Sequence, residues 1–505
     1  MEMSREILVA GVLFFVALVF LYHRSTIAKK LPLPPGPKPR FFSGNGHQLP
    51  SLKPWLTYAS WSKVYGPLVY FRTFNTRFLV LNSSKTALDL LETRSAIYSD
   101  RPRAWMLGVL AGRESAVFTV SFSHPRFKIY RKLLHSGLNV RAVREYSAIQ
   151  MQETKTLLKG LVQTPENFVA HIKRNAGAVI LKVAYGYQVE SHDDKFVRTI
   201  ENAVKFFGAV GVPGRFWVES FPTLRFVPDW FPGAGFKRFA KQIGREVGVI
   251  ERVPFNWAKE QITSGNYLES FISKNLQREV QGPEMEDILR WCSSALYTGG
   301  ADTTVSALTA FFLLMTLYPD IQKKAQNEID RTIGERLPTP EDFSSMPYLS
   351  AMLKEILRWG PVAPLGIRHR VIKDDIYDGY FIPKGTIVIP NIWAITHDPE
   401  IYPDPEVFDP NRHLGEQPQI DPLKFVFGFG RRGCPGSHFA EVSLFLNISS
   451  ILATFDIKKA LDPEGNEIEP VVEWSSGVTS HLKPFECRII PRSKDIHEIL
   501  DLKTE

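Results

Sequence analysis

The chain has 505 residues, 44% of them hydrophobic, and a formal net charge of +8 at pH 7. Its three cysteines, Cys292, Cys434 and Cys487, are too few and too irregularly spaced for a disulfide framework or a zinc site, which indicates a reducing compartment. Lysine and arginine are spread along the sequence rather than gathered into a stripe with stacking aromatics, so we expect no nucleic acid partner.

The first predicted element is a membrane anchor at the N-terminus. Ile7 to Tyr22 is an uncharged and mostly aliphatic run, which His23 and Arg24 extend toward the thickness of a bilayer. The alternative, a cleaved signal peptide, lacks a small-residue cleavage site, and the positive charges after the run favour a cytosolic location for the rest of the chain. We therefore expect residues 1–28 to form a single-pass anchor in the endoplasmic reticulum membrane.

Residues 29–45 are rich in proline and are typical of a stiff hinge between this anchor and the rest of the chain. Residues 46–505 contain no further linker, low-complexity block or internal repeat. The sequence therefore predicts one large domain, 46–505, on the cytosolic side of the membrane.

The segment from Phe206 to Phe239 is dense in phenylalanine and tryptophan and is interrupted by proline and glycine. Such a segment is too aromatic for an ordinary exposed loop. Two interpretations stay open at this point, a lipid-facing lid over a substrate entrance and ordinary packing in the core.

A long helix is predicted from about Met285 to Tyr318, with acidic residues at its start and Pro319 after its end. Its middle reads Gly299-Gly300-Ala301-Asp302-Thr303-Thr304. Two glycines inside a helix cost about 1 kcal/mol each relative to alanine, so we expect a compensating role such as a ligand close to the backbone. If Thr303 bonds back to the Gly299 carbonyl, the helix opens locally, and Asp302 and Thr303 could deliver protons there. The alternative is a glycine-rich helix start capped by Asp302 or Thr303.

A second helix is predicted from Tyr348 to Trp359, where apolar residues recur at helical spacing. Glu355 and Arg358 lie three apart on it, and an exposed ion pair is the ordinary interpretation of that spacing. Further on, Asp378-Gly379 predicts a two-residue hairpin, and the next predicted strand is Thr386 to Ile389. Small sheets beside many helices are expected.

The most informative stretch runs from Phe427 to Gly436 and contains Cys434 among four glycines. Gly428 and Gly436 have no Cβ, so the backbone can approach a flat macrocycle, and Arg432 can neutralise a propionate. A cysteine thiolate on a haem iron favours O–O cleavage. The alternative is a glycine-rich turn with a buried, inert cysteine.

The pattern Phe-x-x-Gly-x-Arg-x-Cys-x-Gly, filled by Phe427, Gly430, Arg432, Cys434 and Gly436, resembles the haem loop of the cytochrome P450 family. The resemblance covers nearly the whole chain from about Pro32. It implies a mainly α fold with small β-sheets (α+β), a long central helix over the haem, and haem b (iron protoporphyrin IX) held through Cys434 as the axial ligand of its iron. The Gly299–Thr304 string resembles the oxygen-binding motif of the same family.

The resemblance also implies roles for residues outside the haem loop. Glu355 and Arg358 would form a buried network with Arg412 that braces the loop. Arg131 and His369 would contact the propionates, although Phe127 replaces the usual tryptophan one turn before Arg131. The expected substrate pocket draws on five parts of the chain, namely Arg103 to Val117, Ala295, Thr298, Val362 to Ile367, and Gly477 to Thr479.

The resemblance implies a monooxygenase that oxidises an apolar small molecule with O2 and electrons from NADPH-cytochrome P450 reductase. Fungal members acting in specialised (secondary) metabolite biosynthesis are the most similar, with terpenoid or indole-type substrates. A basic face for the reductase, or a merely solvated surface, would be formed by Arg126, Lys128, Arg131, Lys132, Lys424 and Arg431. Two alternative functions are a haem-thiolate isomerase or dehydratase that does not use O2, and a membrane-anchored haem-binding protein without catalysis.

Overall fold

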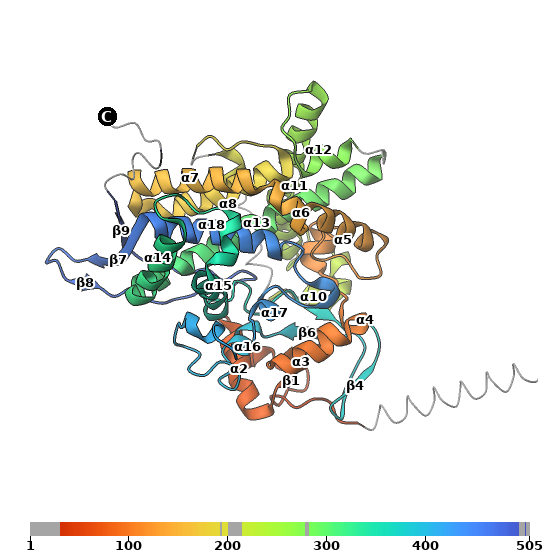
Figure 1. Ribbon diagram of the computed structural model, residues 1–505. Coiled ribbons are helices and arrows are strands. Elements are labelled where there is room, and N and C mark those ends of the chain that lie inside the picture. Colours follow the sequence, from red (N-terminus) through yellow and green to blue (C-terminus); the bar gives the residue numbers. More distant parts are fainter. Residues whose placement is uncertain (1–30, 192–193, 200–214, 278–281, 494–499, 501–505) are drawn as a thin grey trace, which may run out of the picture.

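The computed structural model describes residues 31–191, 194–199, 215–277, 282–493 and 500. Within them, helices form one large body, and a small sheet lies at one end of it together with α2, α3 and α16 (Figure 1). The mainly helical architecture with small sheets confirms the fold class predicted from the sequence. The predicted anchor, residues 1–28, and the first part of the aromatic segment lie outside the described residues.

Nine helices of twelve or more residues carry most of the described core. They are α2 (Pro54–Tyr65), α5 (Pro125–Leu138), α7 (Ser147–Gln163), α8 (Phe168–Tyr185), α11 (Gly235–Ser264), α13 (Pro283–Leu317), α14 (Pro319–Ile333), α15 (Pro347–Trp359) and α18 (Ser437–Thr454). The shorter α-helices are α3 (Ser84–Ala87), α4 (Ser95–Tyr98), α6 (Val140–Glu145), α10 (Trp217–Ser220), α12 (Phe271–Leu276), α16 (Ile392–Thr396) and α17 (Leu423–Val426). Two segments are π-helical, η2 (Leu88–Thr93) and η3 (Trp105–Leu110). The 3₁₀ turns are η1 (Gly46–Gln48), η4 (Pro165–Asn167), η5 (Pro222–Phe226), η6 (Pro340–Ser345), η7 (Pro410–His413) and η8 (Gly430–Arg432).

The described strands form three small sheets. The largest has the order β1-β2-β6-β3 and contains β1 (Leu68–Thr73), β2 (Thr76–Leu81), β6 (Ile387–Pro390) and β3 (His369–Arg370). Its β2 and β6 are parallel and its other neighbours antiparallel. The second sheet is the hairpin of β4 (Asp375–Tyr377) and β5 (Tyr380–Ile382), and the third has the order β8-β7-β9, from β8 (Glu467–Ile468), β7 (Phe455–Leu461) and β9 (Cys487–Pro491).

The Asp378-Gly379 turn has the geometry that its sequence predicts. Both residues have left-handed backbones, with φ of 50° at Asp378 and 76° at Gly379, as a type I′ hairpin turn requires. The predicted strand Thr386 to Ile389 is found as β6, one residue further along the chain.

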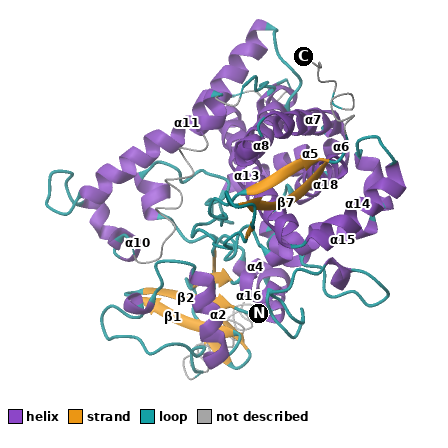
Figure 2. Ribbon diagram, turned by 90° about the vertical axis from the view of Figure 1, so that its left-hand side faces the viewer, coloured by secondary structure: helices purple, strands orange, loops and turns teal. Residues whose placement is uncertain are grey.

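Helix α13 runs through the middle of the helical body, with α8 and α18 beside it (Figures 1 and 2). It begins at Pro283, has Glu284 and Glu286 in its first turn, and ends at Leu317, which confirms the predicted helix to within two residues. Among the described residues it is the one helix long and apolar enough to cross a bilayer. Its apolar window is 78% buried inside the protein, so α13 is a core helix.

The two glycines in the middle of α13 have different explanations. A Cβ on Gly300 would lie 3.0 Å from side-chain atoms of Ile180 on α8, so close packing of the two helices accounts for this glycine. A Cβ on Gly299 would meet only the ring of Phe118, at an ordinary 3.5 Å. Helix packing therefore explains why position 300 is glycine. At position 299 the neighbouring side chains would accept a methyl group, so packing does not explain this glycine.

The core lies on both sides of α13. One cluster joins the C-terminal half of α13 to α14, α15 and α18, and the other joins its N-terminal half to α5, α8 and α11. The predicted apolar face of α15 is buried in the first cluster. Glu328 on α14 accepts the N–H groups of Tyr348 and Leu349 at 2.8 Å each, which fixes the start of α15 against α14.

Candidate active site

The loop from Phe427 to Gly436 folds back on itself so that its two ends meet. The N–H of Cys434 donates to the Phe427 carbonyl at 2.7 Å, and η8 forms the turn between them. Cys434 is exposed to solvent, whereas Cys292 is buried and Cys487 is half-buried. Burial still raises the pKa of the Cys434 thiol, and the Gly436 N–H and the charge of Arg131 oppose that shift only in part. Cys434 is therefore accessible to solvent, although the protein around its sulfur disfavours the thiolate.

The glycines of this loop fix its path. Gly430 has φ of 49°, and a Cβ there would lie 2.5 Å from the Leu91 carbonyl of η2, so only glycine fits. Its N–H donates to the Glu92 carboxylate at 2.5 Å, which ties the loop to η2. Gly428 also has a positive φ, of 78°. A Cβ on Gly436 would meet no protein atom closer than 3.7 Å, so the space beside the sulfur is not crowded by side chains.

Arg432 points from the loop into a polar cluster. Its Nε donates to the Ser99 carbonyl at 2.9 Å and its Nη2 to the Val120 carbonyl at 2.6 Å. The guanidinium lies 4.2 Å from the ring centroid of Phe127, the residue that stands where a tryptophan was expected. Burial lowers the pKa of Arg432 to about 10, and the nearby charge of Asp100 opposes this shift.

Two more basic side chains complete the cluster, and the first of them, Arg101, was not found from the sequence. Its guanidinium is buried and donates to the carbonyls of Phe118, at 3.1 Å, and of Ile367 and Arg368, at 2.6 Å each. Burial and the charge of Arg432 together hold the pKa of Arg101 well below its usual value. No short-range sequence signal marks this arginine, since its partners lie far along the chain.

His369 is the third member of the cluster. Its Nδ1 lies 2.8 Å from the Tyr98 carbonyl, and because a carbonyl can only accept, Nδ1 carries the proton. Burial, with Arg101 next, holds the pKa of His369 well below its usual value. Asp100, the carboxylate whose charge acts on Arg101 and Arg432, already accepts hydrogen bonds from Arg370 and from Ser121. The cluster of Arg101, His369 and Arg432 therefore has basic groups in surplus over carboxylates, a setting that suits the two propionates of a haem.

Arg131 contacts the backbone of the cysteine loop. Its Nη1 donates to the Gly433 carbonyl at 2.8 Å, and its charge lowers the pKa of Cys434, while burial lowers its own pKa. Arg131 therefore stabilises both the path of the loop and negative charge on the sulfur.

Helix α13 presents one accessible stripe in otherwise buried surroundings. Five partly accessible positions in its middle are linked by steps of three or four residues and so share one face, namely Ala295, Thr298, Gly299, Asp302 and Thr303, and the partly accessible Gly300 lies at the edge of this stripe against α8. Buried residues flank them on both sides of the helix. Two of the expected pocket residues therefore share a face with the two predicted catalytic residues.

Thr303 makes the predicted bond to the backbone. Its Oγ1 donates to the Gly299 carbonyl at 2.7 Å. The α-helix nevertheless continues without interruption from Pro283 to Leu317, so the local opening expected from the sequence is not found. A carbonyl oxygen has two lone pairs, and the threonine hydroxyl can use the second without breaking the helical bond.

Packing brings the stripe and the cysteine loop to the same part of the molecule. Helix α18 starts directly after Gly436 and packs against α13, which also contacts α5. One core cluster contains Ala301 beside the stripe, Phe439 beside the loop, and Leu138 of α5. Two cavities of about 350 and 330 Å³ lie elsewhere, the first around Tyr185 and Trp257 and the second around α10.

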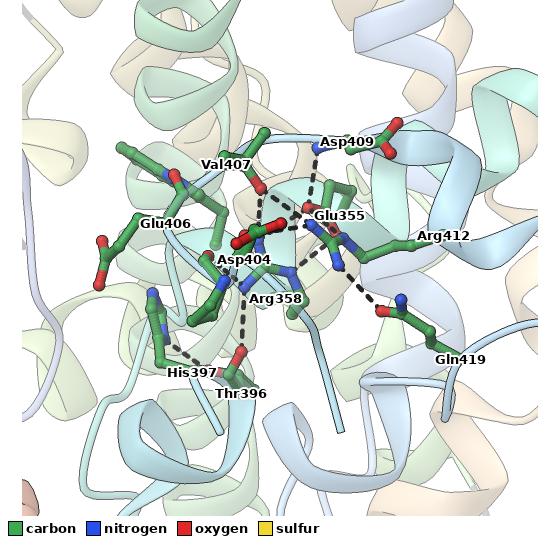
Figure 3. Close-up of polar contacts among 12 residues, drawn as sticks. Glu355, Arg358, Thr396, His397, Asp404, Glu406, Val407, Asp409, Arg412 and Gln419 are labelled. Carbon is green, nitrogen blue, oxygen red and sulfur yellow. Dashed lines mark hydrogen bonds and ion pairs between the residues drawn. The ribbon is translucent and has the colours of Figure 1, made fainter. Parts of the chain in front are cut away.

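Glu355, Arg358 and Arg412 form one buried network that joins α15 to η7, the turn that precedes α17 and the cysteine loop in the chain (Figure 3). The Glu355 carboxylate accepts from Arg358 at 2.8 Å through both oxygens, from Arg412 at 3.0 Å, and from His413 at 2.9 Å. Arg358 also donates to the carbonyls of Thr396, Pro405 and Val407. The spacing of Glu355 and Arg358 alone indicated an exposed pair, and His413 was not identified as a member.

A mostly helical fold, an accessible cysteine in a glycine-rich loop, and a surplus of buried cations beside it define a haem-thiolate protein. The comparison with known proteins agrees. The family model described as Cytochrome P450 matches residues 34–488. The chain belongs to the cytochrome P450 family, which binds haem b through a cysteine thiolate.

Relatives carry monooxygenase names. Cytochrome P450 monooxygenase claR of Ampulloclitocybe clavipes is 42% identical over 484 residues, which cover 95% of this chain and 90% of the relative. Cytochrome P450 monooxygenase 208 of Postia placenta is 41% identical over 506 residues, covering 99% and 98%. Cytochrome P450 monooxygenase ppsD of Aspergillus oryzae is 36% identical over 481 residues, covering 93% and 90%. The protein is a cytochrome P450 monooxygenase, an oxidoreductase that uses O2, a substrate and electrons from a reductase.

Proposed function

We propose that Cys434 is the thiolate ligand of the haem iron and that Arg432, His369 and Arg101 bind the haem propionates. The observation that carries this assignment is the exposed Cys434 beside two buried basic groups, Arg101 and His369, and the half-buried Arg432. Phe427, Gly428 and Gly436 shape the loop around the sulfur, and Arg131 supports it through Gly433. Once bound, the haem supplies the redox chemistry that activates O2.

Asp302 and Thr303 are proposed to hold and pass the protons that O2 activation consumes. They share the accessible stripe of α13 with Gly299, and Phe118 covers the stripe near Gly299. The Thr303 hydroxyl is oriented by its bond to the Gly299 carbonyl, so its oxygen lone pairs can accept a bond from a ligand on the stripe. The isomerase or dehydratase alternative consumes no O2, so NADPH-dependent oxygen uptake by the holoenzyme with reductase separates it from the monooxygenase.

The proposed substrate is an apolar or amphipathic small molecule of fungal specialised metabolism, with terpenoid and indole-type skeletons as the first to test. Small side chains on the stripe, Ala295 and Thr298 among them, support a bulky substrate over this helix. The Ser480 N–H donates to the Val362 carbonyl at 2.9 Å, which places the residue after the expected segment Gly477 to Thr479 against the expected segment Val362 to Ile367. Spectral titration of the purified protein with a panel of such compounds tests the class.

The ligand assignment is tested by replacing cysteines one at a time. In the reduced, carbon monoxide-treated protein, we expect the absorbance band typical of thiolate-bound haem in the wild type and in Cys487→Ser, a control on the edge of β9. Cys434→Ser should lose this band. An unchanged band in Cys434→Ser would refute the assignment, whatever the activity.

The electron donor is proposed to be NADPH-cytochrome P450 reductase, docking on a basic face near the cysteine loop. Of the six basic residues named from the sequence, Lys128, Lys132, Lys424 and Arg431 are exposed. Arg126 is instead paired with Asp287 at the start of α13, and Arg131 contacts Gly433. Four of the six basic residues, and not all six, are therefore proposed to contact the reductase.

Residues 1–28 are proposed to anchor the chain in the endoplasmic reticulum membrane, with residues 29–45 as the hinge and 46–505 as the cytosolic catalytic domain. Exposed aromatic side chains support a lipid contact of this domain as well. Trp217, Phe226 and Trp230 are 66%, 72% and 80% exposed, and ring contacts through Phe74 connect Trp217 to Phe42 in the predicted hinge. A variant that starts at residue 29 should leave the membrane fraction in alkaline carbonate, whereas the full chain should stay in it.

A further inference from the structure

The carboxylate of Asp302 has one basic neighbour within ion-pair distance among the described residues. His481 Nε2 lies 3.1 Å from Asp302 Oδ1. The two atoms are not aligned as a hydrogen bond, and this nitrogen is buried with no other partner. The His481 side chain as a whole is 29% exposed and that of Asp302 is 17% exposed. The imidazole therefore reaches from solvent to a carboxylate on the accessible stripe of α13.

The contact is built by the backbone and not left to a flexible side chain. Asp302 and Ser306 lie four residues apart on one face of α13. Ser306 Oγ donates to the Ser480 carbonyl at 2.6 Å, so the residue before His481 is fixed one turn beyond Asp302. Ser306 thus faces Ser480, and Asp302, one turn earlier on the helix, faces His481.

The loop that carries His481 is closed by hydrogen bonds of its own. The His481 N–H donates to Ser475 Oγ at 2.9 Å, and its carbonyl accepts from the Ser475 N–H at 2.7 Å. Ser480 Oγ donates to the Ser475 carbonyl at 2.9 Å, and the Ser480 N–H donates to the Val362 carbonyl. These bonds leave the imidazole with little freedom except rotation about its own side-chain bonds.

We propose that His481 is a positioning residue for Asp302, which orients its carboxylate and transfers protons to it from solvent. The proposal rests on the proton-delivery role of Asp302 and Thr303 given above. In the transfer, the Nε2–H bond of the imidazolium breaks and a bond forms between that proton and Asp302 Oδ1. The neutral imidazole that remains keeps its other proton on Nδ1, so rotation about its side-chain bonds turns the deprotonated Nε2 toward solvent, where it takes up a proton. Rotation back restores the contact, so each cycle delivers one solvent proton to the stripe.

The ion pair of Asp302 and His481 has no third member. Among the described residues, no second cation lies within ion-pair distance of Asp302, and no second carboxylate lies within that distance of His481. The other polar groups that α13 and the loop bring to this contact are the hydroxyls of Thr303, Ser306 and Ser480. These hydroxyls carry no charge near neutral pH.

The test uses the full-length holoenzyme with reductase, NADPH and 7-ethoxycoumarin as the probe substrate. The measured quantity is hydrogen peroxide released per NADPH consumed, followed across pH. His481→Phe and His481→Gln should both raise this ratio by roughly 3- to 10-fold and flatten its pH profile, with the carbon monoxide spectrum unchanged. The glutamine variant keeps a polar side chain of similar reach but cannot carry the proton.

Two comparisons separate proton transfer from a merely structural effect. Asp302→Asn should match the His481 variants, and the double variant should add nothing to either, because both act through one step. Ser475→Ala removes a bond of the loop without changing the imidazole and should keep the wild-type pH profile. A wild-type ratio and profile in His481→Gln, or additive effects in the double variant, would overturn the proposal.

Failure of the underlying role would give a different pattern. If Asp302→Asn and Thr303→Ala both kept the wild-type peroxide ratio, proton delivery by the stripe itself would be refuted. If those two variants released excess peroxide while the His481 variants did not, only the role of His481 would be refuted.

Discussion

Glu355 should be among the most costly single residues to neutralise in this protein. Its carboxylate accepts five hydrogen bonds, from Arg358 Nε and Nη2, Arg412 Nε, His413 Nε2 and the Asp409 N–H, all between 2.8 and 3.0 Å. The side chains of Glu355 and Arg358 are both 0% exposed, and that of Arg412 is 5% exposed. Glu355→Gln would leave two buried guanidinium groups without a counter-charge (Figure 3).

The expected loss follows from that arrangement. Removing one partner from a buried, hydrogen-bonded ion pair costs about 3–5 kcal/mol, because the remaining charge stays buried and unpaired. The three carbonyls that Arg358 also contacts would keep part of its hydrogen bonding, but they carry no net charge and cannot replace the carboxylate. Against a total stability of about 5–15 kcal/mol for a folded domain, this change would leave a large part of the protein unfolded or without haem.

Glu328→Gln is a matched control on the neighbouring helix. Glu328 accepts two backbone N–H groups at the start of α15 and has no ion-pair partner among the described residues. Its amide can keep one of the two bonds, so the loss should be about 1 kcal/mol. Urea unfolding of both full-length holoenzymes, followed by haem absorbance and tryptophan fluorescence, gives the comparison. Equal stabilities for the two variants, with equal haem content, would refute the reasoning.

The pH dependence of the network provides a second measurement on the same residue. Burial raises the pKa of Glu355, but hydrogen bonds from His413 and Arg358 outweigh it, so the folded pKa lies below the usual 4.5. A carboxyl with a lowered folded pKa stabilises the protein above pH 4.5 and loses that contribution as the pH falls through its folded pKa. Glu355→Gln should therefore lose part of the acid-induced destabilisation seen in the wild type.

Three further predictions use other parts of the structure. Burial lowers the pKa of His397 from 6.5 to about 3, so as the pH falls the unfolded chain binds this proton before the folded protein does. The free energy of unfolding should therefore fall below pH 6.5, by up to about 1.4 kcal/mol per pH unit. Urea unfolding at pH 5 and pH 7 should show a smaller loss of stability between the two pH values in His397→Gln than in the wild type. Gly300→Ala should lower the free energy of unfolding because its methyl group would press on Ile180 of α8, whereas Gly299→Ala should raise that free energy by about 1 kcal/mol through helix propensity. Urea unfolding measures both, and the reverse order would contradict the packing explanation. Reversing the charges of Lys128 and Lys132 should slow turnover with reductase but not with peroxide, and equal losses in both assays would exclude a docking role.

Local patterns predicted those elements whose ends are determined nearby. The acidic first turn of α13, the proline at position 319 and the apolar spacing of α15 are all short-range signals, and both helices are found within two residues of the prediction. The Asp378-Gly379 turn is equally local, since only its own two residues must adopt positive φ. Backbone chemistry within a few residues was sufficient in each case.

Contacts between distant segments could not be predicted in this way. Gly300 is explained by Ile180, on another helix, whereas the sequence alone indicated a ligand close to the backbone. Arg101 is held by carbonyls from two other parts of the chain, so nothing around it in the sequence marks it as buried. His481 gave no signal either, because its relation to Asp302 depends on the bond between Ser306 and Ser480.

The buried cations beside Cys434 connect folding to function. The positive charge of Arg432 disfavours the charged form of Arg101 and so lowers its pKa. Asp100 compensates for this repulsion only in part, because its carboxylate is already bonded to Arg370. Two carboxylates placed among these groups would convert a repulsive cluster into a set of charge-assisted hydrogen bonds. Any ligand that binds only the folded chain stabilises it, by about 2.7 kcal/mol when present at a hundred times its dissociation constant. If Arg101, His369 and Arg432 bind the propionates as proposed, haem binding should therefore also stabilise the fold.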